Sequence, residues 1–187
     1  MIFDPFPISN GLGFLALGGY ILTLLPTNLR IVFPQTKQTS MPKWLLKNRR
    51  AIGVMSFLLA LFHGYLLVIK RDFDFFDLST FGIYIQGVTT FIIFTLLAIT
   101  SNDWSIKRLK KNWKRLHNLT YLAMFLLTWH IWDKMAGHWS YLTPIALIAI
   151  VAINFIYLYR LWIERSNKKQ VSKKKISQPK IQEKVAA

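Results

Sequence analysis

The sequence predicts an all-α integral membrane protein, a bundle of about five transmembrane helices with the N-terminus outside and the C-terminus in the cytoplasm. Of its 187 residues, 53% are hydrophobic, and the mean hydropathy is +0.32. The apolar residues form blocks close to the ~20 residues that a helix needs to cross the ~30 Å hydrocarbon core. The basic residues lie between these blocks, as in membrane proteins generally.

The first expected span follows an N-terminal segment without basic residues, so we expect this block to stay as a membrane helix. Pro26 and Pro34 are expected to end the first helix and its extension. The fourth block is short, at about fifteen residues, so its helix starts before His117 or the bilayer thins there. The expected spans are 8–25, 51–69, 81–100, 118–132 and 141–163.

Charge sets the expected orientation. The loops 26–50 and 101–117 and the segment after residue 164 are rich in Lys and Arg, whereas the loop 70–80 balances Lys70 and Arg71 against three aspartates. By the positive-inside rule, the basic segments are cytoplasmic. The aspartates of the outer loop are Asp72, Asp74 and Asp77.

The chain divides into a membrane domain, 1–164, and a basic tail, 165–187, whose Lys, Ser and Gln content predicts disorder and contact with anionic lipid. Despite the net charge of +16, we expect no nucleic-acid partner, because the basic residues follow the membrane topology. The absence of cysteine excludes disulfides, thiolate-ligated clusters and a catalytic thiol.

Two histidines lie at matched depth in the membrane. His63 is twelve residues past Ala51 and His130 is twelve residues past Asn118, so each is ~18 Å from the inner edge of a span that runs outward. Imidazoles at this depth are rare and costly. Facing histidines on neighbouring helices are typical axial ligands of haem iron. The alternative is a buried imidazole that only hydrogen-bonds within the bundle.

His117 is expected at the inner boundary, as a third metal ligand or as an interfacial side chain beside Trp113 and Arg115. Thirteen residues at ~100° each place His117 about 140° from His130 around an ideal helix. The two share a cleft only if the helix is distorted or His117 lies at its start. His138 is expected to be exposed. The glycines of the first block predict close helix packing rather than a dinucleotide loop: Gly11, Gly13, Gly18 and Gly19.

Several short motifs resemble ferric-reductase-like transmembrane domains. The motifs are Arg49-Arg50-Ala-Ile-Gly53 ahead of His63, Leu97-Ala-Ile-Thr-Ser101, Arg108-Leu109, and Trp113-Lys-Arg-Leu-His117-Asn-Leu-Thr-Tyr121 ahead of His130. Within this family, the chain is most similar to haem-binding membrane subunits that pass electrons to a periplasmic methionine-sulfoxide reductase.

The resemblance implies a b-type haem protein in which His63 and His130 ligate an outer haem and His117 is the third family histidine. A second haem, or a flavin such as FMN, is left open on the inner side. Arg49, Arg50 and Arg115, with Lys114, are candidates to hold haem propionates or a flavin phosphate through charge-assisted bonds.

The chain departs from the family pattern at two sites. Arg49 and Arg50 stand where a second inner histidine would lie, so an inner haem would need water, another side chain or a second subunit as its other ligand. Lys110 occupies a position that is usually glycine. The relatives have six spans, and the first of them has no counterpart among the five expected here.

Nothing in the sequence can bind NAD(P)H, so the expected donor is a cytoplasmic flavin reductase or a membrane quinol. The expected acceptor is an exterior redox protein or ferric iron. This makes the chain the electron-transfer subunit of an oxidoreductase; the alternative is a non-enzymatic membrane anchor or assembly subunit of a redox complex. The expected location is a bacterial inner (plasma) membrane, with a thylakoid membrane as the alternative.

Overall fold

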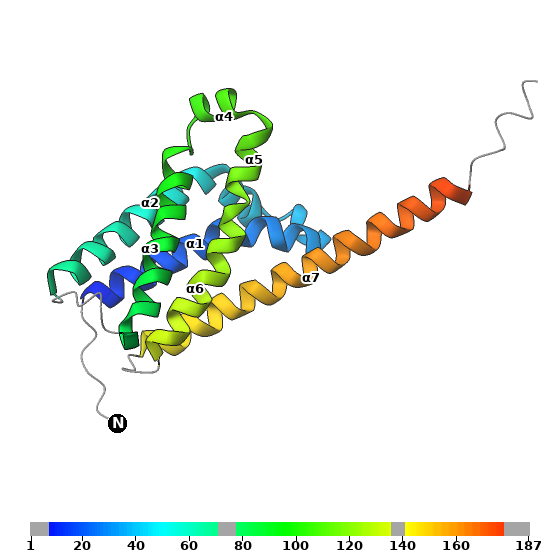
Figure 1. The fold of residues 1–187 in the computed structure, drawn as a ribbon. Helices are drawn as coiled ribbons and strands as arrows, with labels where there is room; N and C mark the ends of the chain where they lie inside the picture. Colours follow the sequence, from blue (N-terminus) through cyan, green and yellow to red (C-terminus); the bar gives the residue numbers. More distant parts are fainter. Residues whose placement is uncertain (1–7, 71–77, 136–140, 178–187) are drawn as a thin grey trace, which may run out of the picture.

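The computed structural model describes residues 8–70, 78–135 and 141–177, and in these the regular structure is entirely helical (Figure 1). A short 3-10 helix, η1, follows the first helix, and two short helices form the turn between α3 and α6. The elements are α1 (Ile8–Val32), η1 (Pro34–Lys37), α2 (Ser40–Lys70), α3 (Leu78–Ile99), α4 (Asp103–Leu109), α5 (Lys111–His117), α6 (Leu119–Met135) and α7 (Leu142–Ser177).

Three of the described helices are long and apolar enough to cross a membrane: α1, α2 and α7. A fourth candidate joins Tyr84–Ile99 to α4 across a bend of 95°. The fourth expected span corresponds to α6, whose 17 residues fall short of the ~20 that span the hydrocarbon core. The all-helical, multi-pass membrane architecture is therefore confirmed, with three to four candidate spans in the described residues.

The core lies where α1, α6 and α7 meet. Leu17, Tyr20 and Leu24 of α1 pack there against Met124 of α6 and three small or branched residues of α7. Those α7 residues are Ala146, Ile150 and Ile153. Helix α2 packs along α1, and α3 packs along α6. Aromatic pairs connect these two helix pairs, because the rings of Tyr20 and Phe94 lie 5.0 Å apart and those of Phe57 and Phe91 lie 5.7 Å apart.

The close packing of α1 on α2 depends on two glycines of α1. A Cβ atom at Gly13 would come within 3.0 Å of the His63 ring, and a Cβ atom at Gly19 would overlap the Ser56 hydroxyl. Gly18, on another face of α1, has nothing within 4 Å of such an atom. The predicted role of small residues in helix packing is thus confirmed for Gly13 and Gly19, and the wider helix spacing that any side chain imposes explains the requirement.

Two sequence expectations were wrong. Helix α1 continues through the buried Pro26 to Val32, because a membrane helix tolerates proline where neighbouring helices cover the backbone group that it leaves unpaired. Residues 165–177 were expected to be disordered but continue α7. At ~1.5 Å per residue, a 36-residue helix is about 54 Å long and extends well beyond a ~30 Å core. The outer aspartates and His138 lie outside the described residues.

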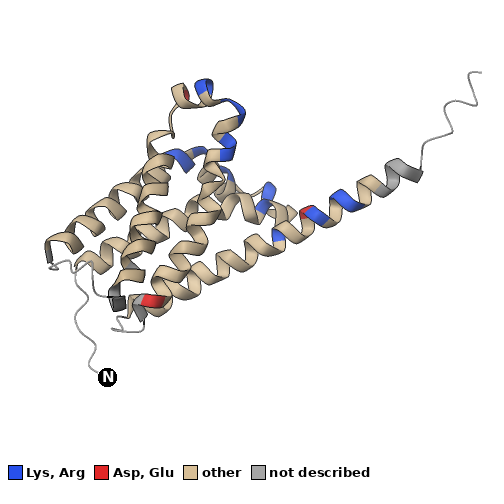
Figure 2. Ribbon diagram, in the orientation of Figure 1, with Lys and Arg blue, Asp and Glu red and all other residues tan. Residues whose placement is uncertain are grey.

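Basic residues gather at one end of the bundle. Figure 2 shows Lys and Arg on α4, α5, the start of α2 and the part of α7 that extends beyond the bundle. The gathering of basic residues expected at one face is therefore present in the described part of the chain.

We expect Gly19→Ala to lower the thermal unfolding temperature in detergent and Gly18→Ala to leave it unchanged or raise it slightly. The added methyl at position 19 meets Ser56, and overpacking of this kind costs about 1–3 kcal/mol. At position 18 only the helix propensity changes, in favour of alanine. Equal effects of the two substitutions would show that the α1–α2 contact is not close packed.

Candidate functional site: a basic cavity and two deeper histidines

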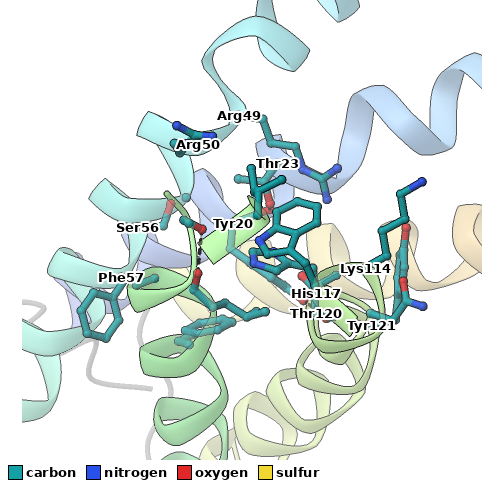
Figure 3. A pocket seen from close by; sticks show the side chains of 18 of the residues that line it. Tyr20, Thr23, Arg49, Arg50, Ser56, Phe57, Lys114, His117, Thr120 and Tyr121 are labelled. Carbon is teal, nitrogen blue, oxygen red and sulfur yellow. Dashed lines mark hydrogen bonds between the residues drawn. The ribbon is translucent and has the colours of Figure 1, made fainter. Parts of the chain in front are cut away.

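A cavity of about 530 Å³ opens at the basic end of the bundle between α1, α2, α3 and the α4–α6 segment. Its size lies within the ~300–1,000 Å³ range of small-molecule sites. One wall is aromatic and polar, with Tyr20, Trp113, His117 and Tyr121, and the α2 wall carries Lys47, Arg49 and Arg50. In Figure 3, Arg49 reaches into the cavity from α2, and His117 and Lys114 approach from the other side.

His117 is held at the cavity by Thr100, the first residue after α3. The hydroxyl of Thr100 lies 2.6 Å from the Leu96 carbonyl, to which it donates. The imidazole Nε2 lies 3.1 Å from the same hydroxyl oxygen and therefore donates to it. The Trp113 indole N–H donates to the Thr100 carbonyl at 2.9 Å, and the Trp113 ring stacks on His117 at 4.0 Å.

These contacts explain the spacing of the motifs that resemble ferric-reductase-like domains. One hydrogen-bonded and stacked group contains Thr100 of the Thr-Ser dipeptide, Trp113 and His117. Trp113 lies 13 residues and His117 17 residues after Thr100. The group fixes the position of the imidazole at the mouth of the bundle.

The cavity is electropositive, and this affects His117. Burial lowers the pKa of His117, and the positive charge of Arg49 lowers it further. The imidazole is therefore neutral at pH 7, the state in which histidine binds metals. Arg50 is largely exposed and pairs with Asp103 at 2.7 Å, and this pairing lowers the pKa of Asp103.

Two breaks set the path of the chain around the cavity. Lys110 joins α4 to α5 with φ 47° and ψ −117°, a conformation that costs a side-chain-bearing residue about 1–2 kcal/mol. Asn118 separates α5 from α6. His117 therefore ends a separate short helix, so the two histidines at 117 and 130 do not share one continuous ideal helix.

His63 lies deeper in the bundle, between α2 and α1. Its Nδ1 is 2.6 Å from the Ser9 carbonyl. Because a carbonyl only accepts, Nδ1 carries the proton and the ring lone pair lies on Nε2. The ring packs against Gly13, where a side chain would meet it at 3.0 Å.

His130 has a similar environment on the other helix pair. A Cβ atom at Gly87 of α3 would lie 3.3 Å from its ring. One turn further along α6, Asp133 accepts a hydrogen bond of 2.6 Å from the amide nitrogen of Gln86. Gln86 and Thr90 are buried on α3, each 4% exposed.

The structure groups the expected site residues into two sets. His117, Arg49 and Arg50 line the cavity together with Lys114, whereas Arg115 does not line it. The other two histidines, at 63 and 130, lie outside the cavity lining.

Sequence reasoning missed the contribution of Arg160. This residue donates to the Tyr121 hydroxyl at 2.9 Å and to the Asn28 side chain at 3.1 Å, and so supports the cavity wall from α7. Its position inside the last apolar block was the available signal.

Comparisons with known proteins identify the family of this chain. Residues 12–128, more than half of the chain, match the ferric reductase like transmembrane component family. The chain belongs to this family. The matched range in this ferric reductase-like protein contains the cavity, His63 and His117 and ends two residues before His130.

Curated relatives carry the name protein-methionine-sulfoxide reductase heme-binding subunit MsrQ. Those from Brucella ovis, Brucella canis and Brucella suis are each 32% identical to this ferric reductase-like chain over 161 residues. The alignments cover 80% of this chain and 65% of each relative. The chain thus spans slightly less than two thirds of the length of these relatives. No solved structure matches the chain.

We expect Lys110→Gly to raise the thermal unfolding temperature in detergent, because glycine adopts positive φ without the steric cost that lysine has there. The expected gain is about 1 kcal/mol. Lys107→Gly, inside α4, removes the same charge from a helical position and should destabilise by a similar amount. Destabilisation by both substitutions would contradict a strained backbone at residue 110.

Proposed function

We propose that the chain is a b-type haem membrane subunit that carries electrons from its basic, cytoplasmic face to an exterior acceptor. The observation that carries the proposal is the placement of two histidines at one depth. His63 and His130 lie 13 residues beyond the cavity residues Arg50 and His117. Along α2 this corresponds to about 20 Å, and His130 lies 11 residues, or about 17 Å, past the first residue of α6. Both helices lead away from the basic end.

The residues present fit a haem. Each of the two deep imidazoles packs against a glycine of a neighbouring helix, so that the absence of a side chain at the glycine makes room for the ring. Among the described residues, no group of three or more His, Asp or Glu could hold a metal ion. Two imidazoles are enough for a prosthetic group whose metal already has other ligands, as in haem. When bound, haem supplies an iron centre that accepts and releases one electron.

The two histidines would hold the haem iron, His63 through its Nε2 atom. The Ser9 carbonyl accepts from Nδ1 of His63, and so fixes both the tautomer and the ring orientation, as is usual for metal-binding histidines. The apolar helices around both rings exclude water and thereby influence the redox potential. Phe57 and Phe91, stacked at 5.7 Å, fill the space between this level and the cavity.

The cavity would receive the electrons. Its arginines and lysines suit an anionic group, either the propionates of a second haem or the phosphate of a flavin such as FMN. Arg49 is the strongest candidate, because Arg50 already pairs with Asp103 and Arg115 lies outside the cavity lining. The proposed donors are a cytoplasmic flavin reductase and a membrane quinol.

The proposed topology has five spans, with α6 as the fourth, the N-terminus outside and the C-terminus in the cytoplasm of a bacterial inner membrane. The basic residues at one end of the bundle support it (Figure 2). The name of the relatives suggests a methionine-sulfoxide reductase as the exterior partner; ferric iron is the other candidate acceptor. The chain would then be the electron-transfer subunit of an oxidoreductase.

The first test is the reduced-minus-oxidised visible spectrum of the detergent-purified protein, with haem quantified against protein. We expect sharp low-spin b-type bands that disappear in His63→Ala and in His130→Ala, because each variant loses one axial ligand. His117→Ala should keep these bands and slow their appearance when the electrons come from the cytoplasmic side.

A matched control is the exposed Trp129, beside His130 on α6. Trp129→Phe should leave the spectrum intact. Unchanged low-spin bands in both ligand variants would overturn the assignment of His63 and His130. A protein without haem after expression with ample haem would favour the anchor or assembly subunit.

A further inference from the structure

Gln86 is a buried amide with an orientation set by its partner. Its side chain is only 4% exposed, and its nitrogen lies 2.6 Å from an oxygen of Asp133. An ionised carboxylate only accepts hydrogen bonds, so the amide nitrogen must face Asp133 and the amide oxygen must face the other way. The short distance is typical of a charge-assisted bond.

The amide oxygen of Gln86 is buried and has no hydrogen-bond partner in this structure. A buried acceptor without a donor costs about 1–3 kcal/mol. A stable membrane protein therefore presents such an atom to a donor that arrives later or shifts into place. A candidate for that donor lies on the facing helix α6.

His130 lies on the same α3–α6 seam. Gly87, the residue after Gln86, packs against the His130 ring. A Cβ atom at Gly87 would lie 3.3 Å from Cε1 and 3.7 Å from Nδ1 of that ring. Asp133, which holds Gln86, is one helical turn beyond His130 on α6. The amide and the imidazole are thus neighbours across two helices.

We propose that Gln86 is a positioning residue whose amide oxygen accepts a hydrogen bond from Nδ1–H of His130 when the Nε2 atom of His130 ligates the haem. The inference rests on the proposed function. It gives His130 the counterpart of what His63 already has in the Ser9 carbonyl, an acceptor that fixes the tautomer and makes the imidazole a stronger ligand. Asp133 acts one step further out, by holding the amide in the productive orientation.

The test compares Gln86→Met, Gln86→Glu and Thr90→Val in the full chain. Methionine preserves the volume and removes the acceptor. Glutamate keeps a side-chain oxygen in place, because two carboxyl groups as close as residues 86 and 133 share one proton and so keep their contact. Thr90→Val is the matched control, because Thr90 is equally buried one turn away and its hydroxyl also has no hydrogen-bond partner in this structure. The readouts are the dissociation constant for haem added to the haem-free protein and the midpoint potential of the bound haem.

We expect Gln86→Met to weaken haem binding about tenfold and to shift the midpoint potential upward, since a weaker imidazole donor stabilises ferric iron less. Gln86→Glu should leave the potential unchanged or lower it, and Thr90→Val should leave both readouts unchanged. An upward shift in Gln86→Met alone supports the inference even if the affinity falls less.

An unchanged potential in Gln86→Met, or an upward shift in Gln86→Glu, would overturn the role of Gln86 while the haem bands of the parent protein leave the proposed function intact. A shift in Thr90→Val but not in Gln86→Met would assign the acceptor to Thr90 and overturn the inference. If Gln86→Met does not fold, an upward shift in Gln86→Glu still decides against it. A parent chain that takes up no haem would overturn the proposed function and this inference together.

Discussion

The structure depends on one constraint: polar groups within an apolar bundle must find their partners inside the protein. Several polar groups at membrane depth meet this constraint through contacts between helices. The Tyr20 hydroxyl donates to the Thr120 carbonyl and connects α1 to α6, and Asn154 of α7 donates to Thr128 of α6 at 2.8 Å. These contacts fix the rotation of the helices about their axes, which apolar packing alone would leave weakly specified. The positions of the histidines follow from that rotation.

The same constraint separates the bundle into two levels with different chemistry. At the basic end, charged side chains reach water, and Arg160 connects Tyr121 to Asn28 with Glu164 as its own counter-ion at 2.8 Å. Deeper in the bundle, His63 contacts the neutral Ser9 carbonyl, and the Asp133 carboxylate lies one helical turn beyond His130. The cation-rich end suits the anionic group proposed for the cavity, and a carbonyl acceptor suits the proposed metal-binding imidazole.

The sequence predicted those features that depend on local composition. Hydropathy located the helices, charge located the basic end, and the glycine pattern indicated close packing that Gly13 and Gly19 confirm. The sequence alone could not predict contacts that bring distant residues together, such as Thr100 with His117 or Gln86 with Asp133. Arg115 was grouped with Arg49 because both are basic and near the boundary, yet only the geometry of the short helix α5 decides which of them lines the cavity. The helical residues after 164 were missed because the prediction rested on their lysine-rich composition alone, whereas a preceding stable helix makes each added turn easier to form.

The break between α4 and α6 explains how a single connection can serve both levels. A continuous helix through residues 111–135 would turn His117 about 140° away from His130. The positive φ of Lys110 and the interruption at Asn118 instead let α5 set its own orientation, with Trp113 and His117 stacked toward Thr100. Helix α6 is then oriented independently by its packing on α3 and α7. The backbone cost at residue 110 is thus offset by the freedom to place one histidine at the cavity and the other in the interior.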